Sequence, residues 1–99
     1  MPKLTLVMER KPVRVFEVNS SVINIGRAED MQLMIDDASV SRRHAKIIRS
    51  GTDYHVLEEV GTVNGTYVNE QRIPTGAPVN LHNGDLLKIG LVAMKAVFD

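Results

Sequence analysis

The stretch "HAKIIRSGTDYHVLE", residues 44–58, decides the fold class. Its two runs, 44–49 and 53–58, alternate apolar with polar side chains, and a Ser-Gly-Thr segment separates them. A period of two residues is typical of a half-buried β-strand, because successive side chains of a strand point to opposite faces. The stretch therefore predicts two short strands rather than a helix.

Similar short runs continue through most of the chain. They are rich in β-branched residues, are bounded by Gly, Pro, Asn, Asp or Ser, and occur at 4–8, 13–18, 22–25, 32–35, 66–69, 85–89 and 92–98. No window repeats apolar residues at helical spacing over three turns, so we expect at most one helical turn, around 39–43. Many short strands predict an all-β antiparallel sandwich or barrel. The segment "PTGAP", 74–78, predicts a loop or an edge irregularity.

The composition limits the classes of function. Twelve basic residues balance twelve acidic ones over 99 residues, which argues against nucleic acid or an anionic membrane as the partner. The absence of cysteine excludes disulfides, thiolate metal sites and a cysteine nucleophile. We expect no signal peptide, because no long apolar run follows the first charged residue, and no run approaches the roughly 20 apolar residues that a membrane span needs. We therefore expect one cytoplasmic domain without a membrane partner.

Binding residues of such a sandwich are expected on the loops at its ends. The first candidate loop is "NIGRAED", 24–30, in which Gly26 ends a predicted strand and Arg27 follows directly. The plain interpretation is a turn glycine followed by a solvated arginine. Alternatively, the glycine lets the backbone turn so that the guanidinium points into a cleft, where its planar fork suits a phosphate or a carboxylate.

The second candidate loop is "SVSRRH", 39–44. Ser41 can cap the helical turn, with His44 as a core-edge residue held by one hydrogen bond. Alternatively, the Ser41 hydroxyl and backbone N–H groups at the start of the turn form an anion-binding concavity, and Arg42 and Arg43 raise its positive potential. A third interpretation is a Ser-His nucleophile, but no orienting acid or oxyanion donor is recognisable.

The third candidate loop is "VGTVNGTYVN", 60–69. Asn64 and Gly65 form the usual hairpin turn signal, because both residues tolerate positive φ. A second Asn-Gly pair at 83–84 shows that this signal is weak by itself. The alternative role for Asn64 is to bind the main chain of an extended peptide with its side-chain amide.

The remaining polar residues form no coherent catalytic set. Asp36 and Asp37 are adjacent carboxylates of a kind that is usually solvated on a loop, and the three histidines lack ligand spacing. We therefore expect no metal, no cofactor and no enzymatic activity.

Read in order, Gly26-Arg27, Ser41-x-x-His44 and Asn64-Gly65 resemble the signature of a forkhead-associated (FHA) domain. The segment "NGDLLKIG", 83–90, is similar to a later part of the same family's pattern. The resemblance extends from about residue 4 to about residue 98, so we expect a single FHA domain over 1–99. It implies an antiparallel β-sandwich of about eleven short strands. It also implies recognition of phosphothreonine on a partner protein through loops at one end.

The resemblance further implies roles for single residues. Arg27 and Ser41 match the family's phosphate contacts, and Arg42 matches a frequent extra contact. Asn64 matches the residue that holds the backbone of the bound peptide. The positions that shape and brace the loops are matched by Gly26, His44 and Gly65.

One position departs from the family's pattern. Many members read Ser-Thr-Asn-Gly where this chain reads Thr62-Val63-Asn64-Gly65. Val63 occupies the place of a threonine whose hydroxyl reaches the phosphate, and losing one such donor costs roughly 1.5–3 kcal/mol, about ten- to a hundredfold in affinity. We expect weakened rather than abolished binding. Thr62 would compensate if the loop were displaced by one residue.

Two other kinds of binding protein are alternatives. A phosphate-independent scaffold would use a sandwich face or an exposed edge strand. A nucleic-acid binder would use the basic residues at 42, 43, 46 and 49, but the neutral charge and a total of two Tyr and two Phe argue against it. The family's domains usually lie inside larger proteins, so we expect either a monomer or part of a multidomain protein.

Overall fold

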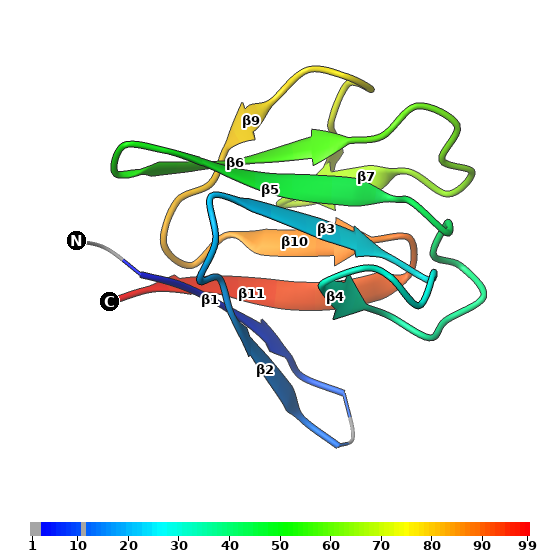
Figure 1. The fold of residues 1–99 in the computed structure, drawn as a ribbon, viewed down its shortest axis with the longest axis horizontal. Helices are drawn as coiled ribbons and strands as arrows, with labels where there is room; N and C mark the ends of the chain where they lie inside the picture. The colour runs from blue at the N-terminus through cyan, green and yellow to red at the C-terminus, as the bar shows by residue number, and fades with distance from the viewer. Residues whose placement is uncertain (1–2, 11) are drawn as a thin grey trace.

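The computed structural model describes residues 3–10 and 12–99 as two β-sheets packed face to face (Figure 1). Residues 1, 2 and 11, which the expected domain of 1–99 includes, lie outside the described residues. One sheet has six strands in the order β2-β1-β11-β10-β7-β8, and the other has five in the order β4-β3-β5-β6-β9. The predicted all-β sandwich is therefore confirmed.

The strands are short, as the alternating segments predicted. The six-stranded sheet contains β1 Leu4–Met8, β2 Arg14–Glu17, β7 Thr66–Val68, β8 Gln71–Arg72, β10 Leu86–Ile89 and β11 Val92–Phe98. The five-stranded sheet contains β3 Val22–Gly26, β4 Leu33–Met34, β5 Ala45–Ser50, β6 Asp53–Glu58 and β9 Val79–Asn80.

Alternate residues of the central strands form the core between the sheets. In β1, Leu4 and Leu6 are fully buried, and their register places them opposite Phe98 and Ala96 of β11. From the other sheet, Ile47 of β5 is also fully buried in this core. Because one face of each strand is covered and the other is solvated, the period of two in the sequence fixes which residues enter the core.

Two features differ from the sequence-based expectation, the strand direction of β4 and the strands β8 and β9. The sheets are not wholly antiparallel, because β4 pairs with β3 in parallel, with Ile25 opposite Leu33. Residues 39–43 form an irregular loop, and no helix occurs within residues 3–10 and 12–99, in agreement with the expectation of at most one helical turn. It follows that no described segment is a helix that could cross a membrane. The strands β8 and β9 were not predicted, because each has only two residues and, unlike β4 within 32–35, neither lies in a longer run that reads as a strand.

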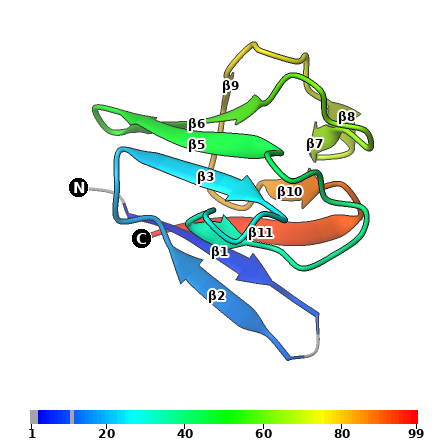
Figure 2. The same cartoon turned by 45° about the vertical axis from the view of Figure 1, so that its right-hand side comes forward.

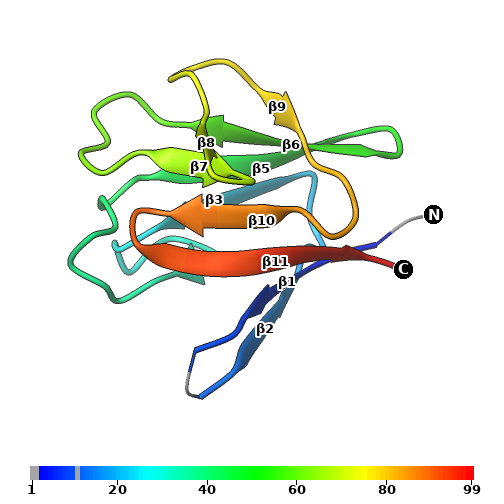
Figure 3. The same ribbon diagram turned by 180° about the vertical axis from the view of Figure 1, so that it is seen from behind.

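Four connections gather at one end of the sandwich, away from the two chain termini (Figures 1 and 2). They are the β3–β4 loop, the β4–β5 loop, the β6–β7 loop and the tight β10–β11 turn. The view from behind places the β10–β11 turn at the same end as the β6–β7 loop (Figure 3). The turn belongs to the six-stranded sheet and three of the strands that lead into the loops belong to the five-stranded one, so this end joins both sheets.

Candidate functional site

Arg27 follows β3 directly and is exposed at the loop end. Its backbone N–H donates to the carbonyl oxygen of Ser41 at 3.0 Å, and its side-chain Nε donates to that of Val40 at 3.0 Å. Among the described residues, no carboxylate forms an ion pair with Arg27. The side chain is therefore oriented by one neutral hydrogen bond, and its Nη groups remain available to an anion.

Gly26 allows the β3–β4 and β4–β5 loops to lie in contact. A Cβ added at Gly26 would lie 2.1 Å from the carbonyl oxygen of Arg42, which is backbone and cannot move aside as a side chain can. In the β3–β4 loop, the N–H of Ala28 donates a hydrogen bond of 3.2 Å to the same oxygen. The glycine is required here for close approach of two backbones rather than for an unusual φ.

His44 braces the loops from below. It is fully buried, with Nδ1 accepting from the N–H of Ser41 at 3.0 Å and Nε2 lying 2.9 Å from the carbonyl oxygen of Gly65. These partners fix a neutral ring that carries its proton on Nε2. Burial lowers the pKa of His44, against the opposing effects of the Gly65 carbonyl and the Glu58 carboxylate. The expectation of a core-edge histidine with one hydrogen bond was therefore wrong, because both ring nitrogens are used.

Ser41 lies in an irregular loop, so its expected role as cap of a helical turn is wrong. The anion-binding concavity stays a prediction, without the helical turn and without the N–H of Ser41, which His44 accepts. A Ser-His nucleophile is excluded by geometry, since His44 directs neither ring nitrogen at the hydroxyl. The Ser41 Oγ instead accepts the N–H of Val63 at 3.2 Å. Its own proton is therefore available to an anion.

The β6–β7 loop supplies Asn64, whose Nδ2 donates to the carbonyl oxygen of Ser39 at 2.8 Å. Asn64 and Gly65 do not form a hairpin turn, because β6 and β7 belong to different sheets. The hairpin turn in this part of the chain is made by Asn69 and Glu70, which join β7 to β8 with φ values of 50° and 71°. Val63 is 80% exposed beside Asn64.

Glu58 anchors the start of the β6–β7 loop and was not singled out from the sequence. It is fully buried, and its Oε2 accepts the Thr75 hydroxyl at 2.6 Å, whereas its Oε1 makes no hydrogen bond to any described residue. Burial raises its pKa, but the neighbouring hydroxyls of Thr75, Thr66 and Thr62, together with the charge of Arg72, lower it below the ordinary value. Thr62 thus lies against Glu58.

The three loops enclose a pocket of about 300 Å³. Its lining residues are Arg27, Ala38, Ser39, Val40, Ser41, Arg42, Val63 and Asn64. The structure therefore brings together five of the residues that the sequence marked for peptide binding. It does not place Thr62 in the pocket lining, so the expected compensation by Thr62 is not supported. The three loop-shaping residues, Gly26, His44 and Gly65, are buried.

Comparison with known families decides the classification. The family model described as the FHA domain matches residues 23–90. This chain belongs to the FHA domain family. The matched segment begins in β3 and ends at the β10–β11 turn, so it includes all the residues that line the pocket.

Relatives of this FHA domain include regulatory proteins and phosphopeptide complexes. An oxoglutarate dehydrogenase inhibitor of Corynebacterium jeikeium is 43% identical over 76% of this chain and 49% of its own length. The chain thus spans about half the length of this relative. A structure of Mycobacterium tuberculosis EmbR in complex with a low-affinity phosphopeptide has a TM-score of 0.86 and 28% identity, covering 96% of this chain and 24% of EmbR.

A further FHA structure comes from work on phosphothreonine-dependent FHA domain interactions. It also has a TM-score of 0.86, with 26% identity, and the match covers 96% of this chain and 95% of the other. This FHA domain therefore shares its fold, over 96% of its length, with an FHA domain from that work.

Proposed function

We propose that this FHA domain binds phosphothreonine-containing peptides or proteins in the three-loop pocket and acts as a signalling adaptor. The observation that carries the proposal is the meeting of Arg27, Ser41 and Asn64 around one pocket, although they come from three separate connections. Arg42, exposed in the same lining, adds a second cation. The four residues are spread over 38 positions of a chain with no net charge, so the fold itself creates this local positive site.

The chemistry of the pocket suits a phosphate monoester. The phosphate carries about −1.5 to −2 charges at pH 7 and presents three acceptor oxygens. The Nη groups of Arg27 offer a planar donor fork, and the Ser41 hydroxyl offers one further donor. Each charge-assisted hydrogen bond contributes roughly 1.5–3 kcal/mol. Two or three such bonds would make the unphosphorylated peptide a far weaker ligand.

The pocket also favours binding over catalysis. Both ring nitrogens of His44 are occupied by the backbone, and Glu58 is buried beneath the loop. Neither group therefore serves as a base for the Ser41 hydroxyl. Together with relatives that are regulators, this supports an adaptor role without a reaction, inside a larger protein or as a separate domain.

A phosphate-independent scaffold is the second candidate. It is favoured by the apolar side chain of Val63, which is 80% exposed at the pocket where a hydroxyl donor is typical of the family. Val60 in the same loop is 87% exposed. Such a surface would hold a partner by apolar contact without a phosphate.

Retention of a degenerate phosphothreonine peptide library on the immobilised domain separates the two candidates. The library is applied untreated, after phosphatase treatment and with phosphoserine in place of phosphothreonine, to the natural domain and to Ser41→Ala. A matched control is Ser20→Ala, an exposed serine in the β2–β3 connection.

We expect retention of the untreated library only, and its loss in Ser41→Ala but not in Ser20→Ala. Binding should weaken below about pH 6, where the phosphate loses its second charge. Equal retention of the phosphatase-treated library would instead establish the scaffold function.

A further inference from the structure

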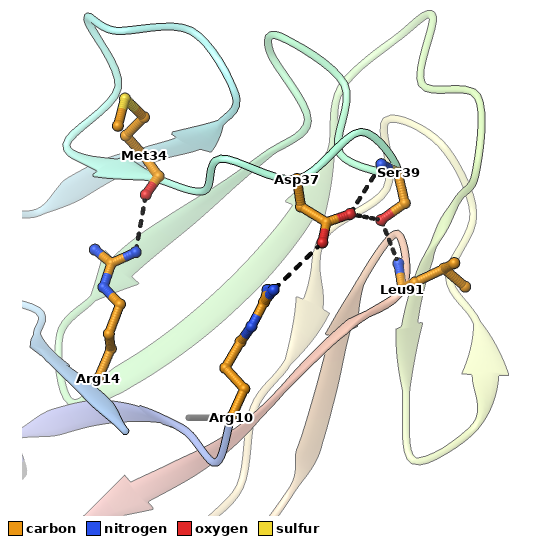
Figure 4. A network of polar contacts seen from close by, with 6 residues as sticks. All are labelled: Arg10, Arg14, Met34, Asp37, Ser39 and Leu91. Atoms are coloured by element: carbon orange, nitrogen blue, oxygen red, sulfur yellow. Dashed lines mark hydrogen bonds and ion pairs between the residues drawn. The ribbon is translucent and has the colours of Figure 1, made fainter. Parts of the chain in front are cut away.

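A series of polar contacts joins the β1–β2 hairpin to the β4–β5 loop (Figure 4). Arg10, just after β1, places its Nη2 3.5 Å from Oδ2 of Asp37 in the β4–β5 loop. The other carboxylate oxygen of Asp37, Oδ1, accepts the backbone N–H of Ser39 at 2.9 Å and the Ser39 hydroxyl at 2.6 Å. Nearby, Arg14 of β2 donates to the carbonyl oxygen of Met34 at 3.2 Å.

Ser39 is the point at which this series of contacts reaches the pocket. Its Oγ accepts the N–H of Leu91 in the β10–β11 turn at 2.9 Å, and its carbonyl oxygen accepts Nδ2 of Asn64 at 2.8 Å. The fit is close, because a Cβ added at Gly90 would lie 2.4 Å from the same carbonyl oxygen. One residue thus contacts the β6–β7 loop and the opposite sheet at the same time.

The donors and acceptors in these hydrogen bonds indicate that Asp37 orients the side chain of Ser39. The Ser39 hydroxyl has a single proton, and its oxygen already accepts from Leu91, so the proton must be given to an acceptor. The hydrogen bonds from Ser39 lower the pKa of Asp37, desolvation opposes them, and the charge of Arg10 adds a smaller lowering effect. Asp37 therefore remains an ionised acceptor at neutral pH and fixes the rotamer of Ser39.

We propose that Asp37 is a positioning residue for phosphopeptide binding, which acts through Ser39 on Asn64 and on the β10–β11 turn. The proposal rests on the proposed function. Asp37 is absent from the pocket lining, so its effect on a ligand is transmitted by Ser39, whose carbonyl orients the Asn64 carboxamide.

The direction in which the phosphopeptide affinity changes distinguishes loss of positioning from loss of the Asp37 charge. A carboxylate near a bound dianion repels it, so removal of that charge alone should tighten phosphopeptide binding. Loss of positioning should weaken binding instead. Asp36 is the matched control, because it is an exposed neighbouring carboxylate that forms no hydrogen bond to a described residue.

The affinity for one phosphothreonine peptide is measured for the natural domain, Asp37→Ala, Asp37→Asn, Asp36→Ala, Asn64→Ala and the Asp37→Ala/Asn64→Ala double variant. We expect Asp37→Ala to bind about tenfold more weakly, Asp37→Asn less so, and Asp36→Ala no more weakly than the natural domain. In the Asn64→Ala background, Asp37→Ala should add little. Unchanged or tighter binding by Asp37→Ala, or an additive loss in the double variant, would overturn the proposal.

Nuclear magnetic resonance of the free domain provides a readout that does not depend on a ligand. The side-chain amide signals of Asn64 and the backbone amide of Leu91 should shift in Asp37→Ala and stay in place in Asp36→Ala. If Asp37→Ala does not fold, Asp37→Asn and Ser39→Ala are compared with Asp36→Ala in its place. Failure of the natural domain to bind any phosphopeptide would reject the proposed function and this role together. If the natural domain binds the phosphopeptide and Asp37→Ala binds it with the same affinity, only the role of Asp37 is rejected.

Discussion

Val63 is the residue at which this chain offers the pocket one donor fewer than its family pattern does. Its backbone N–H donates to Ser41 Oγ at 3.2 Å and it lines the same pocket, so a hydroxyl at position 63 would be added beside the Ser41 hydroxyl. Val63→Thr should tighten phosphothreonine-peptide binding by about ten- to a hundredfold, because one charge-assisted bond contributes roughly 1.5–3 kcal/mol.

Isothermal titration of both proteins measures this change, with Val60→Thr as the control. Val60 is an equally exposed valine of the same loop that does not line the pocket. An unchanged affinity in Val63→Thr, or an equal gain in both variants, would contradict the assignment of position 63.

His44 should make the stability of the domain depend on pH. Burial lowers its pKa from the ordinary 6.5, so the unfolded chain takes up a proton before the folded one does. The free energy of unfolding should therefore be fully maintained above about pH 6.5 and fall as the pH drops below it, towards the lowered value. The lowered pKa values of Glu58 and Asp37 act only below their ordinary values of 4.5 and 3.8.

Urea unfolding at several pH values between 5 and 7.5 measures the slope that His44 produces. His44→Gln should flatten it in this range, since glutamine does not titrate. His55→Gln, on β6, should keep it. A slope that survives in His44→Gln would assign the effect to another group.

The sequence identified part of the pocket at the residue scale. Arg27, Ser41 and Asn64 were predicted through a family signature, because their types and order recur. Asp37 and Ser39 were not predicted, because their importance arises from contacts. Ser39 meets Leu91, 52 positions away, and no local pattern encodes that meeting.

At the scale of elements, Gly26 sets the separation between the β3–β4 and β4–β5 loops. Gly26→Ala should destabilise the domain by about 1–3 kcal/mol, because its Cβ meets backbone that has to shift. The same shift should weaken phosphopeptide binding at least tenfold.

Gly76→Ala is the control, because nothing lies within 4 Å of its Cβ and its φ of 76° costs about 1–2 kcal/mol of strain by itself. Denaturant unfolding and peptide titration measure both variants. Phosphopeptide binding should persist in Gly76→Ala, whereas normal binding by Gly26→Ala would show that the loop separation is not critical.

The β7–β8 turn contains backbone strain that a single substitution can relieve. Glu70 has a φ of 71°, a conformation that glycine adopts without cost, and Asn-Gly is the preferred pair for such a turn. Glu70→Gly should stabilise the domain by about 0.5–1 kcal/mol, which raises the melting temperature by about 2–8 °C.

Asn69→Gly should not stabilise the domain, because the Asn69 carboxamide accepts the N–H of Leu86 and donates to Asp85. Thermal melting followed by circular dichroism compares the two variants. A lower melting temperature for Glu70→Gly would show that the glutamate makes a compensating contact.

The strands themselves were largely predictable. The longer ones, such as β6 at Asp53–Glu58, contain enough alternating residues for a period of two to be recognised. The parallel placement of β4 was not predicted, because it depends on the route of the β3–β4 loop. The Asn-Gly pair at 64–65 is a weak turn signal, and the hairpin turn that joins β7 to β8 uses Asn69 and Glu70 instead.

At the scale of the whole molecule, the sandwich holds loops from both sheets against one another. The Ser39–Leu91 hydrogen bond crosses from the β4–β5 loop to a turn of the six-stranded sheet, and the His44–Gly65 contact joins the same loop to the β6–β7 loop. The pocket walls are thus held together by one exposed and one buried contact between connections, and such preorganisation reduces the entropy lost when a peptide binds. The net charge of zero leaves this local cluster as the attraction for a phosphate.

The most direct test of the account is the affinity of Arg27→Ala for a phosphothreonine peptide, measured beside the natural domain. Arg27→Lys tests the donor fork, and Lys95→Ala removes an equal charge from an exposed position on β11. We predict a loss of at least tenfold in Arg27→Ala, a similar loss in Arg27→Lys and no loss in Lys95→Ala. Binding by Arg27→Ala that equals that of the natural domain would contradict the account.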